Sequence, residues 1–300
     1  ELEEKKTEVK DIRGKWKQVA RDLNKMQTQS QGFYQITDNY LIDLVTRLRY
    51  NIRIFSIQYF SRYIGHVTVD SEVVSDRDSY FSRFVTSTPN SRFYLTSSDR
   101  RPSIIQVVLW KAIVHDLFGH FRWAGDASKS IWKLCGYFEP NADPKSSPNP
   151  EAIRKFQVWS AMTIGLFQSA VESGADIEVH EGLRKWKGRF FQDIDEAIRP
   201  FQGVRNGGYE QELTRIIDQA LDLDKEISRQ LSKIDWVFGD DNGGMVFDSK
   251  LMELEKGQKP AGSKQQVSLV ISPGVKKRGK STGEGFNEQS VLLRMEVSCE

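Results

Sequence analysis

The fold class is decided by residues 103–124, which read SIIQVVLWKAIVHDLFGHFRWA. Drawn as a helix, this stretch is apolar around almost its whole circumference, which is typical of a helix buried inside a larger protein. Pro102 at the first turn and Gly125 just past the end predict the limits of the helix. We therefore predict that it is the central core helix of a soluble helical domain. The uninterrupted apolar run is too short to span a bilayer, because polar residues interrupt it at Lys111, His115, Asp116 and His120.

Composition places the chain among ordinary globular proteins. Its 300 residues suffice for one large domain or two small ones, and 38% of them are hydrophobic. The formal net charge is +2, so no global field draws the chain to nucleic acid or to an anionic membrane. The two cysteines, Cys135 and Cys299, make neither a disulfide framework nor a zinc set. The low cysteine count and the lack of an Asn-x-Ser/Thr sequon favour a reducing compartment, so we expect an intracellular protein, cytoplasmic or nuclear.

Residues 1–27 carry the spacing of a coiled-coil seam and are predicted to form a separate N-terminal helix. Apolar residues recur at alternating steps of three and four positions, and charged residues fill the places between them. One interpretation is a helix that packs on its own domain. The other is a helix that pairs with a second chain or with a segment upstream. The seam also includes Met26, and its candidate interaction residues are Val9, Ile12, Trp16, Val19 and Leu23.

Residues 33–238 are predicted to form the helical core domain, and we expect seven to nine helices in the chain. Thr37 or Asp38 is the expected cap of the helix over 38–63. One face of that helix is predicted to be buried, with a stripe of Leu41, Val45, Leu48, Ile52, Phe55 and Tyr59. Further helices are predicted over 76–86, 127–135, 150–173, 182–201 and 208–237. The helix over 150–173 is broadly apolar, so we expect it to pack on the core helix.

Two segments read as connections, and the last part of the chain changes character. Residues 86–103 are dominated by Ser, Thr, Asn and Pro, which predicts a surface loop, and Pro140–Pro150 resembles a linker. Residues 239–300 form a mixed tail, in which Val267–Ser272 and Val291–Val297 read as two strands. The predicted fold class is therefore mainly α: a multi-helix domain with an N-terminal heptad helix and a small β element near the C-terminus.

Two sets of charged residues are interpreted as solvated helix faces. The arginines of the first predicted core helix could contact an acidic partner, but such side chains more often keep their heads in water over buried stems. The carboxylates of the last predicted helix alternate with Lys225 and Arg229, which is typical of i,i+4 pairs in solvent. The first set is Arg47, Arg49, Arg53 and Arg62, and the second is Asp218, Asp222, Asp224 and Glu226.

The adjacent pair His115-Asp116 is the first candidate for chemistry. A His-Asp pair inside an apolar helix resembles the signature of the HD-type phosphohydrolases, in which imidazole and carboxylate bind a divalent metal that activates water. Asp116 and His120 would share a helix face, so His115, Asp116 and His120 are the candidate metal ligands. That family pattern also needs an upstream His and a downstream Asp, for which His66 and Asp176 are available. The competing interpretation, which we favour, is a buried polar pair satisfied by neighbouring helices.

The segment Gly274–Ser281, GVKKRGKS, matches the phosphate-binding template G-x-x-x-x-G-K-[ST] and follows a predicted strand. The mechanism requires a helix directly afterwards, whose N-terminal amides hold the phosphates. The next residues, TGEGFN, are a poor helix start. We therefore favour a basic hairpin loop over a nucleotide site.

Residues 184–191 mix basic and aromatic side chains. Such a cluster can hold phosphates and stack bases, or lie at an anionic lipid surface. At this low net charge we favour an amphipathic helix with its aromatic side buried. The candidate interaction residues are Arg184, Lys185, Trp186, Lys187 and Arg189.

Several stretches together resemble a group of filamentous-fungal proteins of unassigned function, in which a helical domain follows a charged coiled-coil segment. They are DNYLIDLVTRLRYNIRIFSIQYF at 38–60, VLWKAIVHDLFGHFRWAG at 108–125, RKFQVWSAMTIGLF at 154–167 and SPGVKKRGKSTGEGF at 272–286. The resemblance spans most of the chain but implies no activity, ligand or catalytic residue. It also implies that the Gly274–Ser281 segment belongs to the tail of a helical protein.

These observations favour a non-enzymatic interaction or scaffold module with no cofactor. The N-terminal heptad helix would bind a protein partner or mediate self-association. One alternative is a metal-dependent phosphohydrolase of the HD type. The other is a peripheral nucleic-acid or membrane-surface binder that uses residues 184–191.

Overall fold

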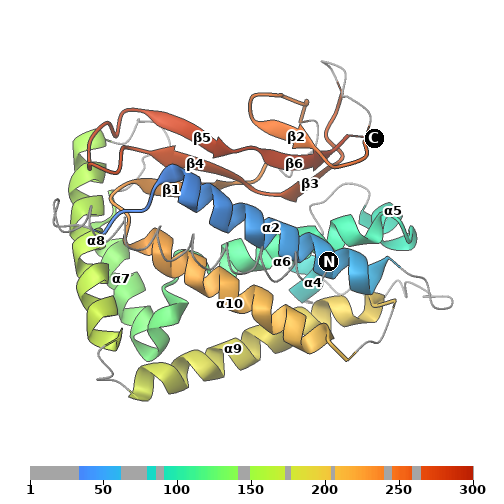
Figure 1. Cartoon of the computed structure of the whole chain (residues 1–300), viewed down its shortest axis with the longest axis horizontal. Helices are drawn as coiled ribbons and strands as arrows, with labels where there is room; N and C mark the ends of the chain where they lie inside the picture. The colour runs from blue at the N-terminus through green and yellow to red at the C-terminus, as the bar shows by residue number, and fades with distance from the viewer. Residues whose placement is uncertain are drawn as a thin grey trace, which may run out of the picture.

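A computed structural model of the chain describes residues 34–61, 80–85, 91–140, 149–172, 177–203, 207–239, 245–258 and 265–299. Within these ranges the protein is mainly α, as predicted, with eight α-helices and two three-stranded sheets. Figure 1 shows the strands gathered along one edge of the molecule, with α2 and α6 beneath them and α8 at one side. The expected heptad helix over residues 1–27 lies outside the described residues.

The helices agree with the sequence pattern at most places. The α-helices are α2 (Asp38–Phe60), α4 (Tyr80–Val85), α5 (Ser91–Thr96), α6 (Arg101–Asp116), α7 (Ser128–Phe138), α8 (Pro150–Glu172), α9 (Ile177–Ile198) and α10 (Tyr209–Ser228). Two short 3₁₀ helices are η1 (Arg122–Ala127) and η2 (Arg199–Phe201). The Thr37 hydroxyl accepts a hydrogen bond from the Tyr40 amide and caps α2, as expected. All six stripe residues predicted for α2 are buried.

Helix α6 lies at the centre of the core. Its residues from Ile104 to Trp110 are buried, and α2, α4, α5, α9 and strand β3 (Leu269–Ser272) pack around it. The helix ends at Asp116, eight residues before the predicted limit of Ala124. Gly119 and Phe121 both have left-handed backbone conformations, with φ of 74° and 54°, and these cannot continue an α-helix.

The structure corrects two expectations about neighbouring helices. Helix α8 packs mainly on α10 rather than on α6, and the ring of Phe167 contacts Trp123 of η1. The predicted loop over 86–103 contains α5, in which Tyr94 and Leu95 are buried. The Ser- and Thr-rich composition concealed this short helix, because only two adjacent residues hold it against the core.

The predicted helix over 208–237 ends at Ser228, and the chain continues as strand β1 (Lys233–Val237). Apolar residues continue through this segment at helical spacing, yet β1 pairs antiparallel with β4, so tertiary pairing overrides the local pattern. Among the described residues of the tail, 239–300, there are five strands, where two were predicted. The remaining strands are β2 (Met252–Leu254), β4 (Gly274–Arg278), β5 (Gln289–Leu293) and β6 (Met295–Ser298).

The two sheets have strand orders β1-β4-β5 and β2-β6-β3, and the chain crosses between them three times, twice through a single residue. Pro273 joins β3 to β4, and Arg294 joins β5 to β6, so the predicted single strand Val291–Val297 is divided between the sheets. The buried Arg49 guanidinium of α2 donates Nη2 hydrogen bonds to the Pro273 carbonyl at 2.7 Å and the Arg294 carbonyl at 3.0 Å. One side chain therefore ties α2 to both single-residue crossings.

Arginines on α2 were expected to form a solvated face, and two of them do not. Arg49 also pairs with Glu253 of β2 at 2.9 Å, and Arg53 pairs with the buried Glu296 of β6 at 3.0 Å. Both ion pairs therefore connect α2 to strands of the fold rather than facing solvent. Arg47 does fit the expectation, since its partner Asp43 lies one turn away on the same helix. Arg62 lies outside the described residues.

Substitution of Gly125 by Ala is expected to destabilise the fold by at least about 2 kcal/mol. Gly125 has φ 56° and ψ −128°, and a Cβ there would collide with the Val179 carbonyl oxygen of α9. Urea unfolding measures the loss. Gly165→Ala in α8 is the matched control, because nothing lies within 4 Å of the added Cβ. That change is expected to stabilise by about 0.5–1 kcal/mol. Equal stability of the wild-type chain and Gly125→Ala would contradict the close approach of η1 and α9.

Candidate functional site

The His115-Asp116 pair lies at the end of α6 and does not form a centre with His120. His115 Nδ1 lies 2.8 Å from Asp116 Oδ1, while His120 Nε2 lies 2.9 Å from the His115 backbone oxygen. Asp116 instead accepts a 2.7 Å hydrogen bond from the Tyr80 hydroxyl of α4, with Arg83 at 3.5 Å. Within the described ranges, no group of three His, Cys, Asp or Glu residues is placed to hold a metal ion.

The favoured interpretation of this pair as buried is correct for only part of it. Asp116 is partly buried and satisfied by α4, but the His115 side chain is 58% exposed. The early end of α6 explains the difference, because it places His115 and Asp116 in a last turn near the surface. His66 and Asp176, the further ligands that the family pattern would need, lie outside the described residues.

The Gly274–Ser281 segment forms a strand and a turn. Residues 274–278 are strand β4, and the chain then turns through 279–288 into β5. Gly279 has φ 77°, and the Phe286 ring fills the space beside it. The segment is therefore a hairpin, as favoured above, and in the described residues that follow it there is no helix to supply the amides of a phosphate site.

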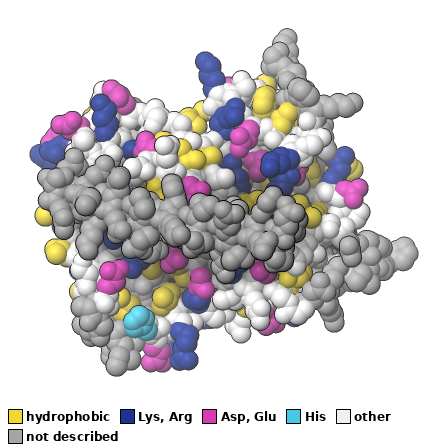
Figure 2. All heavy atoms as spheres, in the orientation of Figure 1, with side chains coloured by type: hydrophobic (Ala, Val, Ile, Leu, Met, Phe, Trp, Pro, Cys, Tyr) yellow, Lys and Arg dark blue, Asp and Glu magenta, His cyan; other side chains and the backbone are white. Residues whose placement is uncertain are grey.

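The basic and aromatic residues 184–191 lie on α9, and their partners are within the protein. Lys185 pairs with Glu181, and Lys187 pairs with Asp218 of α10. The Trp186 ring stacks on Phe190 at 4.8 Å. Arg184 and Arg189 are exposed. On the face seen in Figure 2, lysine and arginine alternate with aspartate and glutamate rather than forming a basic patch. The cluster therefore fits the amphipathic helix that the sequence favoured.

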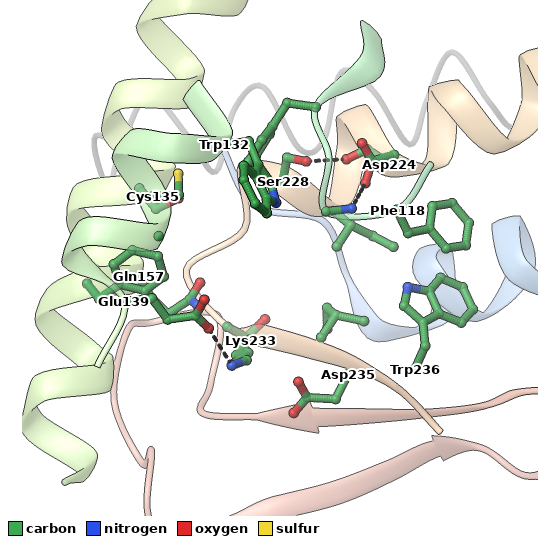
Figure 3. Close-up of a pocket in the computed structure, with 18 of the residues that line it drawn as sticks. Phe118, Trp132, Cys135, Glu139, Gln157, Asp224, Ser228, Lys233, Asp235 and Trp236 are labelled. Atoms are coloured by element: carbon green, nitrogen blue, oxygen red, sulfur yellow. Dashed lines mark hydrogen bonds and ion pairs between the residues drawn. The ribbon is translucent and has the colours of Figure 1, made fainter. Parts of the chain in front are cut away.

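A cavity of about 510 Å³ is bordered by elements that are distant in sequence. It lies where the C-terminal ends of α6, α7 and α10 meet one face of α8 and strand β1 (Figure 3). Its volume is typical of small-molecule sites, which range over about 300–1,000 Å³. Sequence analysis did not predict this site, because no local motif encodes the meeting of five elements.

Asp224 of α10 is the buried acid of this cavity, with 2% of its surface exposed. Its Oδ1 accepts a 2.8 Å hydrogen bond from the Gly119 amide, while Oδ2 is buried without a partner of normal geometry. Burial raises the pKa of Asp224 to about 7, against smaller lowering effects of Gly119 and the nearby Trp123. The expectation that this carboxylate lies on a solvated face is therefore wrong.

A signal for the burial of Asp224 was present in the sequence. The apolar stripe of α10 passes through Leu213, Ile217, Ala220 and Ile227, and position 224 continues its steps of three and four. An acid inside such a stripe marks a buried polar site.

Two further carboxylates and one lysine line the cavity. Glu139, which follows α7, pairs with Lys233 of β1 at 2.9 Å. Asp235 of β1 projects toward the same space (Figure 3) and forms no ion pair with any described residue. Lys233 therefore balances Glu139, while Arg122 favours the charged form of Asp224 from outside the cavity lining.

Aromatic rings form much of the wall. The Phe118 and Trp236 rings stack at 4.5 Å, and Trp132 of α7 lies across the cavity from them (Figure 3). The outer face of Trp132 stacks on His120 at 5.9 Å. Cys135 is buried beside Ser160, as expected for a small hydrophobe, and burial raises the pKa of its thiol.

Large apolar side chains are exposed beside the cavity on α7 and α8. The two helices contact one another through Phe138 and Trp159, whose rings lie 4.8 Å apart. Tyr137 is 85% exposed and Leu166 is 74% exposed. We call this set the α7–α8 apolar residues: Leu134, Tyr137, Phe138, Met162 and Leu166.

Comparisons with protein-family models, with curated proteins and with solved structures find no match to this chain. Among the described helices, none is long and apolar enough to cross a membrane.

Proposed function

We propose that this chain is a non-enzymatic interaction module that binds a second copy of itself through the α7–α8 apolar residues. The observation that carries the proposal is the exposure of five large apolar side chains on two helices that contact one another. Scattered exposed apolar residues are normal on a surface, but a group of this size on adjacent helices is typical of an interaction site.

The spacing of these residues supports a packed helical interface. On α7 they stand at positions 134, 137 and 138, and on α8 at 162 and 166, which are the one-face spacings of an α-helix. Tyr and Leu side chains at such positions can pack between the helices of a partner. A second copy is the simplest partner, because a two-fold interface uses the same residues on both sides.

Sedimentation equilibrium of the full chain tests the proposal. We expect a dimer, and we expect the double variant Tyr137→Ser/Leu166→Ser to raise its dissociation constant by about tenfold or more, since each change acts twice in a symmetric interface. Both residues are exposed, so the variant is expected to keep the fold.

The matched control is Val9→Ser/Leu23→Ser in the heptad segment, which should leave the dimer unchanged. A wild-type chain that remains monomeric at every concentration would contradict self-association. A dimer that only the heptad variant disrupts would instead support association through the N-terminal residues.

A further inference from the structure

Helices α2 and α10 lie side by side and leave a groove of about 310 Å³ between them (Figure 1). The Asn51 side chain of α2 donates a 2.6 Å hydrogen bond to Gln219 of α10 and joins the two helices beside the groove. Tyr40 and Leu44 are only partly buried, so apolar surface is left for another element to cover. The apolar part of the lining consists of Tyr40, Leu44, Leu48 and Leu223.

The described part of the chain begins next to this groove. The Arg229 guanidinium, which directly follows α10, lies over the Tyr34 ring at 3.4 Å. Arg229 also pairs at 3.0 Å with Glu226, which lines the groove. Residues 1–33 therefore join the described fold at the end of the groove where α10 ends.

The heptad stretch over residues 9–26 has the length that such a groove accepts. A helix over these residues would be about 27 Å long, against about 30 Å for the 20 residues of α10. The connecting residues 27–33 can extend over about 25 Å. That reach is sufficient for the chain to turn back along the two helices.

The heptad stretch and α10 also carry opposite charge. Arg13 and Lys15 flank the apolar seam, at the positions where charged residues select the partner of a coiled-coil helix. In α10 the acids that are not buried are Glu210, Glu212, Asp218, Asp222 and Glu226, against the bases Arg215 and Lys225. Within 9–26 the bases are Lys10, Arg13, Lys15, Lys17, Arg21 and Lys25, against the acids Asp11 and Asp22.

We infer that residues 9–26 pack as a helix in the α2–α10 groove of their own chain. The apolar seam covers Tyr40 and Leu44, and Arg13 and Lys15 lie toward the acids of α10. The inference goes beyond the proposed function, because it places the heptad residues within the fold rather than in a contact with a second copy. It is independent of the α7–α8 apolar residues, none of which lines this groove.

Amide hydrogen exchange of the full chain, measured by mass spectrometry of its peptides, tests the inference. An isolated helix of this length is marginal in water, so slow exchange over residues 9–26 requires packing against the protein. We expect these amides to exchange at least about tenfold more slowly than those of a synthetic peptide of residues 9–26. The difference should be the same at every chain concentration.

The groove variant is Leu44→Glu, which places a carboxylate against the apolar seam. It is expected to bring the exchange of residues 9–26 to within about twofold of the free peptide. Ile54→Glu is the matched control, because Ile54 lies on the same helix, is 39% exposed and does not line the groove. Peptides from α6 show whether each variant keeps the fold.

Two further variants complete the test. Arg13→Glu/Lys15→Glu leaves the described fold untouched and should also accelerate exchange over residues 9–26. Tyr137→Ser/Leu166→Ser should retain slow exchange, which separates this inference from self-association. The inference is overturned if residues 9–26 of the wild-type chain exchange like the free peptide, or if both Leu44→Glu and Arg13→Glu/Lys15→Glu exchange like the wild-type chain. Slow exchange that develops only as the chain concentration rises would overturn it in favour of a second copy.

Discussion

Replacement of Arg49 by Met is expected to lower the free energy of unfolding by about 3–5 kcal/mol, although Met keeps much of the side-chain volume. The guanidinium is buried and donates to the carbonyl groups at the two single-residue sheet crossings, Pro273 and Arg294, as well as to Glu253. Hydrogen bonds from a charged donor contribute about 1.5–3 kcal/mol each. Methionine would leave both carbonyl groups without this donor.

Urea unfolding followed by circular dichroism measures this loss. Arg47→Met on the same helix is the control, because its partner Asp43 is a partly exposed neighbour one turn away, and such pairs contribute about 0.3–0.5 kcal/mol. Arg49→Lys separates charge from geometry, since an ammonium cannot reach three acceptors in the planar arrangement of a guanidinium. We expect Arg49→Lys to fall between the wild-type chain and Arg49→Met. Equal losses for Arg47→Met and Arg49→Met would show that the crossings do not depend on Arg49.

Arg49 also shows what a sequence pattern leaves out. Its position on a charged helix face looks the same whether the guanidinium meets water or the backbone of residues 273 and 294. The acceptors are carbonyl groups, which every residue has, so no side-chain pattern identifies them. By contrast, the buried stripe of α2 was predictable residue by residue, because helical spacing alone decides which side chains share a face.

Boundaries were predictable only where a local cause exists. Thr37 caps α2 by its own hydroxyl, and the Glu151 amide bonds to the Asn149 side chain at the start of α8. The end of α10 has no comparable signal, because Leu231 and Ile234 continue the helical spacing. Pairing of β1 with β4 decides that boundary, and its partner lies about 40 residues away in sequence.

The candidate site was the least predictable part. The two sequence motifs considered as sites, His115-Asp116 and Gly274–Ser281, are short stretches of adjacent residues. The structure places the first at a helix end and the second in a hairpin. The cavity instead depends on where five elements meet. Asp224 was the one accessible clue, since an acid that continues an apolar stripe is buried unless the helix is free in solution.

Replacement of Asp224 by Asn is expected to remove a pH dependence of stability worth about 4 kcal/mol. In the folded protein burial raises the pKa of this carboxyl from 3.8 to about 7, with the Gly119 hydrogen bond and the nearby Trp123 opposing the shift. Each pKa unit corresponds to about 1.4 kcal/mol of difference between the two protonation states. The shift is large because the carboxyl group is almost completely removed from water.

The direction follows from where the proton resides. Between pH 3.8 and about 7 the folded chain keeps the Asp224 proton while the unfolded chain releases it. The stabilisation that this carboxyl contributes is therefore fully present below its pKa in the unfolded chain. It is lost as the pH rises through its pKa in the folded chain. Burial also raises the pKa of Asp193 and Glu296, which adds to the same trend, so the comparison with the variant isolates Asp224.

Urea unfolding of the wild-type chain and of Asp224→Asn across this pH range measures the difference. We expect the stability of the variant relative to the wild-type chain to rise by about 4 kcal/mol from acid to neutral pH, because asparagine has no proton to lose. Asp218→Asn is the control on the same helix, because it makes the same substitution at a half-exposed position outside the cavity. Parallel curves for Asp224→Asn would mean that solvent reaches the carboxylate in the folded state.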